Sequence, residues 1–302
     1  MNPSTKIVCP HNPLMIIQRL LLCVALALGI TITAKLPEAP QPKTLIFDFG
    51  GVVLKTDRLQ AMKAIAHPSL AIVMLHHCVL NPEPVLRKRL FAFFAAVQPL
   101  NEGQIITHDE HGAPLPQLML DWLQGTPTAE LKGRMRLFLK NNPDFFSSAA
   151  EKRAVLSIAN MMFTPKLFAK TRALIGETIN FIKECKAQGY KIYGLTNWDG
   201  ASLELLKVLY PMIFGPEGLF DGIVSSTDAG TVKPSPIPYR LLIDRYKLQP
   251  ENCIFWDDLE ANVTTAQSLG MHSFLVPKNP TADLMREQLS SCQAPMLSAI
   301  VH

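Results

Sequence analysis

Five short apolar runs, each closed by a polar or turn residue, constrain the fold of this 302-residue chain more than any other feature. They occupy residues 44–49, 191–196, 222–226, 252–257 and 273–276. Runs of this kind are typical of strands that are buried on both faces of a parallel sheet. Helical patterns alternate with the later runs, as in 176–189, which ends at a glycine. The sequence therefore predicts an α/β fold with a doubly wound parallel sheet.

The segment between the first and second runs, residues 50–190, contains no convincing strand. Apolar residues recur there at spacings of three and four, which is typical of helices with one buried face. The helical stretches are 69–80, 84–97, 128–140 and 149–162. We expect an all-helical insertion over residues 56–175, carried by an α/β core made of 44–55 and 176–302.

A different kind of apolar segment lies near the N-terminus, where residues 20–34 read LLLCVALALGITITA after Arg19. The segment is short for a membrane span and has the small residues of a secretory cleavage site. Residues 1–34 are therefore expected to be a signal peptide or a membrane anchor, and a translation start at Met15 would give a well-proportioned signal. The protein is expected to be exported (periplasmic or secreted), or tethered to a membrane through residues 14–34.

Residues 35–43, after this segment, are rich in proline and are expected to form a stiff linker.

Charge and cysteine spacing exclude two classes of function. The formal charge of +4 comes from 29 basic and 25 acidic residues without a long basic run, so nucleic acid is not an expected partner. No pair of cysteines has the CxxC spacing of a zinc ribbon.

Polar side chains follow the predicted strands where each strand ends. Because ligands of open α/β sheets bind outside the carboxyl ends of the strands, these side chains are expected to meet in one crevice. A carboxylate that attacks phosphorus, carboxylates that hold Mg²⁺, and a lysine and a hydroxyl that bind phosphate oxygens suit phosphoryl transfer. The residues concerned are Asp48, Thr196, Asn197, Asp257 and Asp258 at strand ends, and Lys233 in the loop after the third strand.

Four sequence motifs occur in order along the chain: IFDFGGVV, GLTNWD, VKPSPIPYRLL and CIFWDDLEANVTTAQSLGM. Together they resemble the motifs of the haloacid dehalogenase-like (HAD) hydrolase superfamily, in its phosphatase branch, over roughly residues 44–276. The resemblance implies a Rossmann-like core with a helical cap, which corresponds to the insertion.

The resemblance also implies a role for each motif residue. Asp48 would be the nucleophile, and Thr196 and Asn197 would contact phosphate and substrate. Lys233 would stabilise the developing charge. Asp48, Asp258 and the Gly50 carbonyl would bind Mg²⁺. Asp257 and Asn262 would support the loop that carries Asp258.

The first motif departs from the usual Asp-x-Asp pattern, because Gly50 stands where the family has a second acid. In that pattern the first acid attacks and the second protonates the leaving oxygen. General acid catalysis is typically worth about 10²–10⁴-fold, so its loss matters most for poor leaving groups. The Asp-x-Gly form resembles a branch that includes sugar-phosphate phosphatases, whose anomeric leaving oxygen is less basic.

The expected function is therefore Mg²⁺-dependent hydrolysis of a small phosphorylated metabolite, a sugar phosphate first, through an aspartyl-phosphate. Two alternatives remain at this point: a catalytically weakened protein that binds phospho-ligands, and a 2-haloacid dehalogenase. The strand-end residues also have structural interpretations, since Asp48 and Asp257-Asp258 are able to cap helices and Thr196-Asn197 to form a turn. Residues 106–114, ITHDEHGAP, are interpreted as a solvated polar loop.

Overall fold

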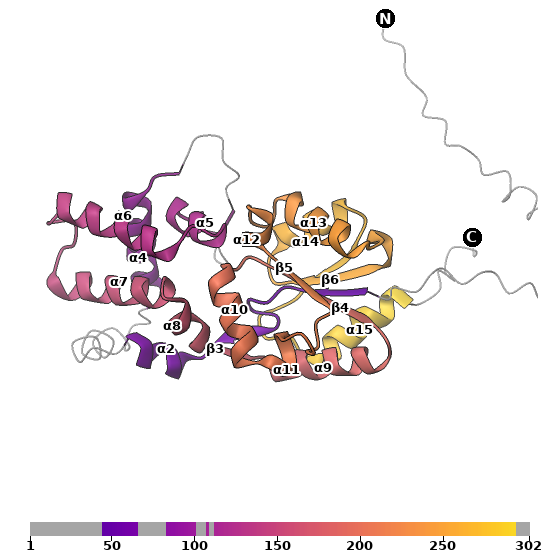
Figure 1. Ribbon diagram of the computed structural model, residues 1–302. Coiled ribbons are helices and arrows are strands. Elements are labelled where there is room, and N and C mark those ends of the chain that lie inside the picture. The colour runs from indigo at the N-terminus through magenta and orange to yellow at the C-terminus, as the bar shows by residue number, and fades with distance from the viewer. Residues whose placement is uncertain (1–43, 66–82, 101–106, 109–111, 294–302) are drawn as a thin grey trace, which may run out of the picture. The chain divides into compact units, whose positions relative to one another are not determined.

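A parallel five-stranded sheet forms the centre of the α/β core (Figure 1). The computed structural model describes residues 44–65, 83–100, 107–108 and 112–293, all within one compact unit, Gln41–His302. The strand order is β5-β4-β1-β6-β7, with every neighbouring pair parallel. The strands are β1 (Thr44–Phe47), β4 (Lys191–Thr196), β5 (Gly222–Ser225), β6 (Cys253–Asp257) and β7 (His272–Leu275). All five predicted strands and the parallel α/β fold are thus confirmed.

Helices cover both faces of this sheet, which is why its strands are apolar on both sides. Leu45 and Phe47 of β1 pack into one hydrophobic cluster, whereas Ile46 between them packs into the other. In Figure 1 the first face carries α9, α10, α11 and α15 and the second carries α12, α13 and α14. These helices are α9 (Gly176–Ala187), α10 (Gly200–Leu209), α11 (Pro211–Phe214), α12 (Ser226–Ala229), α13 (Pro236–Tyr246), α14 (Glu260–Ser268) and α15 (Ala282–Gln293), with a 3₁₀ turn η1 (Pro250–Asn252) before β6.

Between β1 and β4 the described residues form six further helices, most of which enclose a hydrophobic core of their own. Phe93, Phe94, Leu131 and Phe163 are buried in it. The helices are α2 (Arg58–Ile65), α4 (Glu83–Val97), α5 (Gln117–Leu123), α6 (Thr128–Asn141), α7 (Ala149–Met162) and α8 (Pro165–Lys170). The stretches predicted at 84–97, 128–140 and 149–162 are confirmed as helices, and the one at 69–80 lies outside the described residues. The bounds 56–175 of the cap stay a prediction.

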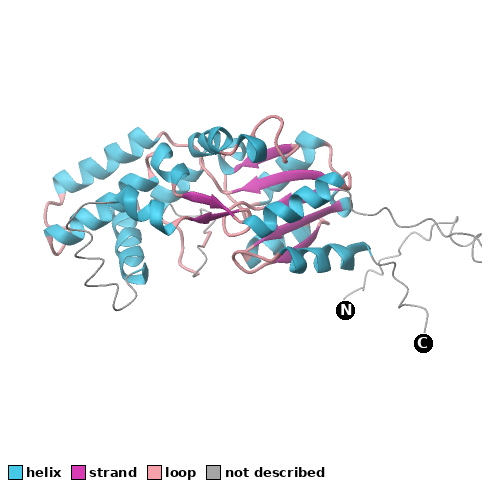
Figure 2. Cartoon of the chain, turned by 90° about the horizontal axis from the view of Figure 1, so that it is seen from below, coloured by secondary structure: helices cyan, strands magenta, loops and turns pink. Residues whose placement is uncertain are grey.

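Two short strands that the sequence did not reveal stand where the chain enters and leaves this helical region. β2 (Leu54–Thr56) pairs with β3 (Arg172–Leu174) in an antiparallel ladder, seen beside the larger sheet in Figure 2. Backbone carbonyls link the helical region to the α/β core, because the hydroxyls of Ser226 and Thr227 hydrogen-bond to the Leu123 carbonyl at 2.6 and 3.2 Å.

The predicted leader, residues 1–34, and the predicted linker, residues 35–43, lie outside the described residues. Among the helices of the described part, none combines the length and the apolar character that crossing a bilayer requires. Export or membrane tethering stays a prediction from the sequence.

Close packing beneath the sheet predicts that Gly194→Ala destabilises the protein. A Cβ on this β4 residue would stand 2.7 Å from ring atoms of Phe49. Overpacking a core typically costs about 1–3 kcal/mol, and the free energy of unfolding in urea should fall by that amount. The control is Gly133→Ala inside α6, where the nearest atom, at 4.0 Å, belongs to Arg136. It should instead gain about 0.5–1 kcal/mol, and equal effects of the two variants would contradict the packing at Gly194.

Candidate functional site

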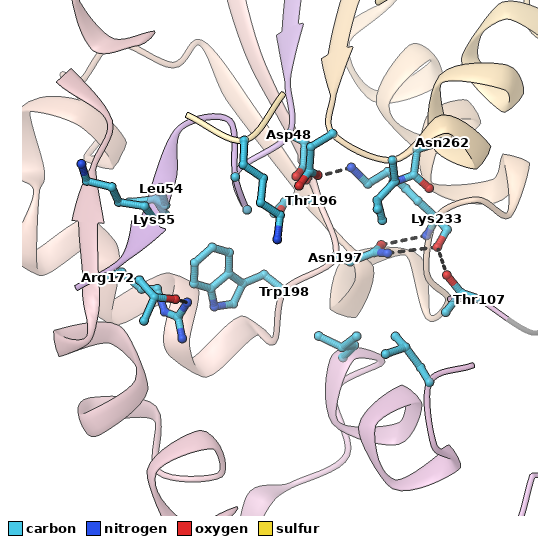
Figure 3. A pocket seen from close by; sticks show the side chains of 18 of the residues that line it. Asp48, Leu54, Lys55, Thr107, Arg172, Thr196, Asn197, Trp198, Lys233 and Asn262 are labelled. Atoms are coloured by element: carbon cyan, nitrogen blue, oxygen red, sulfur yellow. Dashed lines mark hydrogen bonds and ion pairs between the residues drawn. The ribbon is translucent and has the colours of Figure 1, made fainter. Parts of the chain in front are cut away.

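The structure brings the predicted strand-end residues together at the carboxyl edge of the sheet (Figure 3). Asp48 directly follows β1, Thr196 ends β4 and Asp257 ends β6. These strands are neighbours, since β1 pairs with β4 on one side and with β6 on the other. Asp48, Thr196 and Asp257 are all buried. The crevice expected from strand order therefore exists, with its polar groups shielded from bulk water.

Lys233 joins the strand ends through its ammonium group. Its Nζ donates to Asp48 Oδ1 at 2.8 Å, to Asp257 Oδ2 at 2.6 Å and to the Leu195 carbonyl at 2.8 Å. Burial alone would lower the pKa of Lys233, but the Asp257 and Asp48 carboxylates raise it overall. Although Lys233 is only 1% exposed, these two carboxylates favour its charged form, so a positive charge lies beside the Asp48 carboxylate.

The backbone of Lys233 is held by side chains from two other segments. Asn197 accepts from the Lys233 N–H at 2.7 Å and donates to its carbonyl at 3.0 Å. Thr107 donates to the same carbonyl at 3.2 Å. The sequence predicted Asn197 as a phosphate and substrate contact; the structure shows that it positions the Lys233 loop, and its predicted contact with substrate stays a prediction.

The adjacent acids Asp257 and Asp258 have different surroundings. Asp257 is fully buried, and its Oδ1 accepts from the Leu259 N–H and from the Asn262 amide, both at 2.9 Å. With Oδ2 bonded to Lys233, its carboxylate is engaged on both oxygens. No side chain in the described part of the protein donates to Asp258. Asp257 and Asn262 are thus hydrogen-bonded to each other within the segment that follows β6, while Asp258 lines the cavity; the supporting role that the resemblance implies for Asp257 and Asn262 stays a prediction.

Three carboxylates at this edge are placed so that they could hold a metal ion. Asp48, Asp257 and Asp258 each offer one oxygen, and these oxygens lie within 4.8 Å of one another. Burial raises the pKa of Asp48 to about 6, and burial together with the Asp48 and Asp257 carboxylates raises the pKa of Asp258 to about 7. Acids crowded in this way ionise together more easily beside a cation. The oxygen-only donor set fits Mg²⁺.

The two glycines after Asp48 have different conformational requirements. Gly51 has φ +77°, and a Cβ there would stand 2.5 Å from Asp258 Oδ2, so both its conformation and its surroundings demand glycine. Gly50 has no such φ, and a Cβ there would meet only Asp48 Oδ2, at 3.8 Å. Among the described residues no group donates to the Gly50 carbonyl. Position 50 therefore adjoins the Asp48 carboxylate and has room for a side chain.

The site opens into a cavity of about 710 Å³ whose wall also contains residues of the helical region. Thr196 lines it, and its hydroxyl makes no hydrogen bond within the described residues. The sequence interpretation missed several wall residues, namely Thr107, His108, Trp122, Phe168 and Arg172. Thr107 is buried, so the solvated loop proposed for residues 106–114 was wrong at that residue. The segment's mixture of polar types gave no periodic signal, and residues 109–111 lie outside the described part.

A sequence model of the haloacid dehalogenase-like hydrolases matches residues 42–270, which include every strand of the sheet except the last. The chain belongs to this family. The predicted resemblance and the enzyme class, a HAD-like hydrolase, are thereby confirmed.

Individual relatives of this HAD-like hydrolase are similar over parts of their lengths. Mouse "Acyl-CoA dehydrogenase family member 10" is 43% identical over 63 residues, 21% of this chain and 6% of that protein. "Phosphatase MT3486" of Mycobacterium tuberculosis (strain CDC 1551 / Oshkosh) is 28% identical over 118 residues, 37% of this chain and 51% of that protein. The matched part spans about half or less of each.

Among solved structures, a HAD family enzyme of Bacteroides thetaiotaomicron, BT-2542, resembles this fold with a TM-score of 0.51. It is 15% identical, and the match covers 80% of this chain and 98% of that chain. That protein was crystallised in complex with magnesium and inorganic phosphate. The likeness shows a shared fold.

Because Gly51 has a left-handed φ and a crowded Cβ position and Gly50 has neither, alanine should lower the free energy of unfolding more at position 51 than at position 50. In Gly51→Ala the left-handed conformation alone should lower the free energy of unfolding by about 1–2 kcal/mol, with the clash at Asp258 in addition. The matched control, Gly50→Ala, should stay within about 0.5 kcal/mol of wild type. Urea denaturation of the three proteins measures both values. Equal stability of the two variants would contradict the geometry at Gly51.

Proposed function

We propose that this HAD-like hydrolase is a Mg²⁺-dependent phosphomonoesterase that acts through an aspartyl-phosphate on a small phosphorylated metabolite. One observation carries the proposal. The Asp48 carboxylate, bonded on one oxygen to Lys233, faces the same cavity as the Asp258 carboxylate and the Thr196 hydroxyl. A nucleophile, a metal ligand, a cation and a phosphate-binding hydroxyl are the groups that phosphoryl transfer uses.

Asp48, Asp258 and the Gly50 carbonyl are the groups that would hold Mg²⁺. Asp258 and the Gly50 carbonyl have no donor within the described residues, and the carboxylate oxygens lie within ligand reach of one another. Asp257 is a poorer ligand, because both its oxygens are already bonded. Bound Mg²⁺ would neutralise charge on the phosphate and orient it.

The residues of the chain then divide the reaction between them. The Asp48 carboxylate attacks phosphorus, the bond from phosphorus to the ester oxygen breaks, and the leaving oxygen departs with the electron pair as an alkoxide, which takes its proton from solvent water. Water then hydrolyses the aspartyl-phosphate, which releases phosphate and restores Asp48. The Lys233 ammonium, fixed by three acceptors, offsets the negative charge that develops beside Asp48. Thr196 would bind a phosphate oxygen; its hydroxyl makes no hydrogen bond within the described residues, which supports that role.

Two relatives support this function. The similar protein of M. tuberculosis is named a phosphatase, and the B. thetaiotaomicron enzyme with the similar fold was crystallised with magnesium and inorganic phosphate. Gly50 favours substrates with less basic leaving oxygens, because the acid that usually protonates the leaving group is missing. A phosphate carried by an anomeric carbon, as in some sugar phosphates, fits that requirement.

The absence of an acid at position 50 is also the observation that supports two alternative functions, a phospho-ligand binding protein and a 2-haloacid dehalogenase. A protein that kept the crevice and lost efficient turnover would bind phosphorylated ligands without releasing phosphate. A dehalogenase would release halide from 2-haloacids. Phosphate release measured over a panel of sugar and other phosphate monoesters, with and without Mg²⁺, and halide release measured in parallel separate these functions. Release of phosphate that requires Mg²⁺ is the result expected.

Substitution of the nucleophile should abolish turnover. Asp48→Asn keeps the size of the side chain but cannot form the aspartyl-phosphate, so kcat on the best substrate of the panel should fall to background. Asp258→Asn is the comparison, because it should chiefly raise the Mg²⁺ concentration needed for half-maximal rate. Thermal unfolding of both variants controls for the fold. Mg²⁺-dependent turnover that persists in Asp48→Asn would remove Asp48 from the role of nucleophile.

The open space at Gly50 predicts that the missing acid can be installed. Gly50→Asp would place a carboxyl beside Asp48, in a conformation that a side chain tolerates. If wild type lacks a general acid, its kcat/KM should fall steeply as the pKa of the leaving group rises. The variant should accelerate alkyl phosphates by up to about 10²–10⁴-fold and aryl phosphates hardly at all.

A series of monoesters with graded leaving-group pKa, assayed with wild type and Gly50→Asp, measures the two slopes. Gly50→Asn is the matched control, since it fills the same space without a carboxyl group. Equal slopes for a folded, Mg²⁺-binding Gly50→Asp would show that wild type obtains the proton elsewhere.

A further inference from the structure

One wall of the cavity contains a partly buried guanidinium that the proposed reaction does not use. Arg172 lies on β3, where the chain returns from the helical region. In Figure 3 it stands at the opposite side of the cavity from Asp48, Thr196 and Lys233, with Trp198 between them.

Its contacts within the protein leave its charge unbalanced. Its Nη1 donates to the Thr56 hydroxyl at 2.7 Å, and its Cζ lies 4.2 Å from the centre of the Phe168 ring. Its Nε is buried without a hydrogen-bond partner, and no carboxylate of the described residues pairs with it. Burial lowers the pKa of Arg172 to about 10, and no carboxylate offsets that effect. A partly buried cation without an acid is costly unless a ligand supplies the negative charge.

The surroundings of Arg172 would hold such a ligand in a fixed orientation. The aromatic ring of Phe168 stacks edge-to-face on Trp122 and on Trp198, with centroids 5.0 and 5.5 Å apart. The Tyr210 hydroxyl donates to the Arg172 carbonyl at 2.8 Å, which ties its backbone to α10. The acids that line the cavity in the described part are Asp48 and Asp258 alone, and both belong to the phosphoryl-transfer site.

We propose that the substrate carries a second anionic group, a carboxylate or a second phosphoryl group, which binds the Arg172 guanidinium while its phosphate ester binds at Asp48. This inference rests on the proposed phosphatase function and narrows its substrate class to monoesters that have an oxyanion at the far end. The carbon skeleton between the two groups would lie against the aromatic wall formed by Phe168 and Trp198. A guanidinium presents paired donors that match an oxyanion, which a lysine at the same place would not.

Binding of non-hydrolysable probes tests the inference without turnover. The probes are alkylphosphonates of graded chain length and, for each length, the analogues that end in a carboxylate or in a second phosphonate. Calorimetric titration of the full chain in the presence of Mg²⁺ gives the ratio of dissociation constants between each neutral-ended and anion-ended pair. The best-fitting anion-ended probe should bind about tenfold or more tightly, as expected for charge-assisted hydrogen bonds, and the preferred end group identifies the oxyanion.

Substitutions assign that preference to one side chain. In Arg172→Gln the ratio should fall to about one, and in Arg172→Lys, which keeps the charge, it should fall severalfold because the paired donors are lost. The matched control is Arg58→Gln, since Arg58 also lines the cavity but is exposed. Its ratio should stay within about twofold of wild type, because exposed charges are screened.

Three outcomes would overturn the inference: no preference of wild type for any anion-ended probe, a preference that survives in folded Arg172→Gln and Arg172→Lys, or equal losses in Arg172→Gln and Arg58→Gln. Because these measurements record binding alone, they stand apart from the phosphate-release panel. A failure of that panel with the probe ratios intact would reject the hydrolytic function and leave the anion subsite standing.

Discussion

The three hydrogen bonds of the Lys233 ammonium group hold the site together. One buried cation satisfies Asp48, Asp257 and the last carbonyl before Thr196, so the ends of three neighbouring strands share a single partner. Removing it would leave the negative charges of two buried carboxylates without a compensating cation. The backbone of Lys233 is in turn held by hydrogen bonds to Asn197 and Thr107. The position of the Asp48 carboxylate therefore depends on a loop that follows β5 and on contacts from outside the sheet.

The core of the fold was predictable because its strands are buried on both faces and read as continuous apolar runs. The same reasoning missed β2 and β3, which are three residues long and whose partners lie more than a hundred residues apart. It also missed α5 and α8, because 7 and 6 residues are too few to show a helical period clearly. Pairings of this kind arise from tertiary packing, and local sequence carries little trace of them.

At the site, strand topology and the motif resemblance located Asp48, Thr196, Lys233, Asp257 and Asp258, since each follows or ends a strand or lies in a motif. Neither source revealed that both polar atoms of the Asn197 side chain hydrogen-bond to the Lys233 backbone. Neither revealed that Arg172 lines the cavity. Arg172 belongs to a segment without motif or period, and the pairing of β2 with β3 places it in the wall of the cavity that Asp48 also lines.

Three hydrogen bonds that join the helical region to the α/β core use backbone carbonyls as acceptors. The hydroxyls of Ser226 and Thr227 bond to the carbonyl of Leu123, and Thr107 bonds to the carbonyl of Lys233. A carbonyl is the same whatever side chain its residue bears, so the residue that contributes the acceptor is free to change during divergence without breaking the contact. Docking of this type allows residues of the helices, including those that line the cavity, to be substituted, while the polar residues at the strand ends keep their positions.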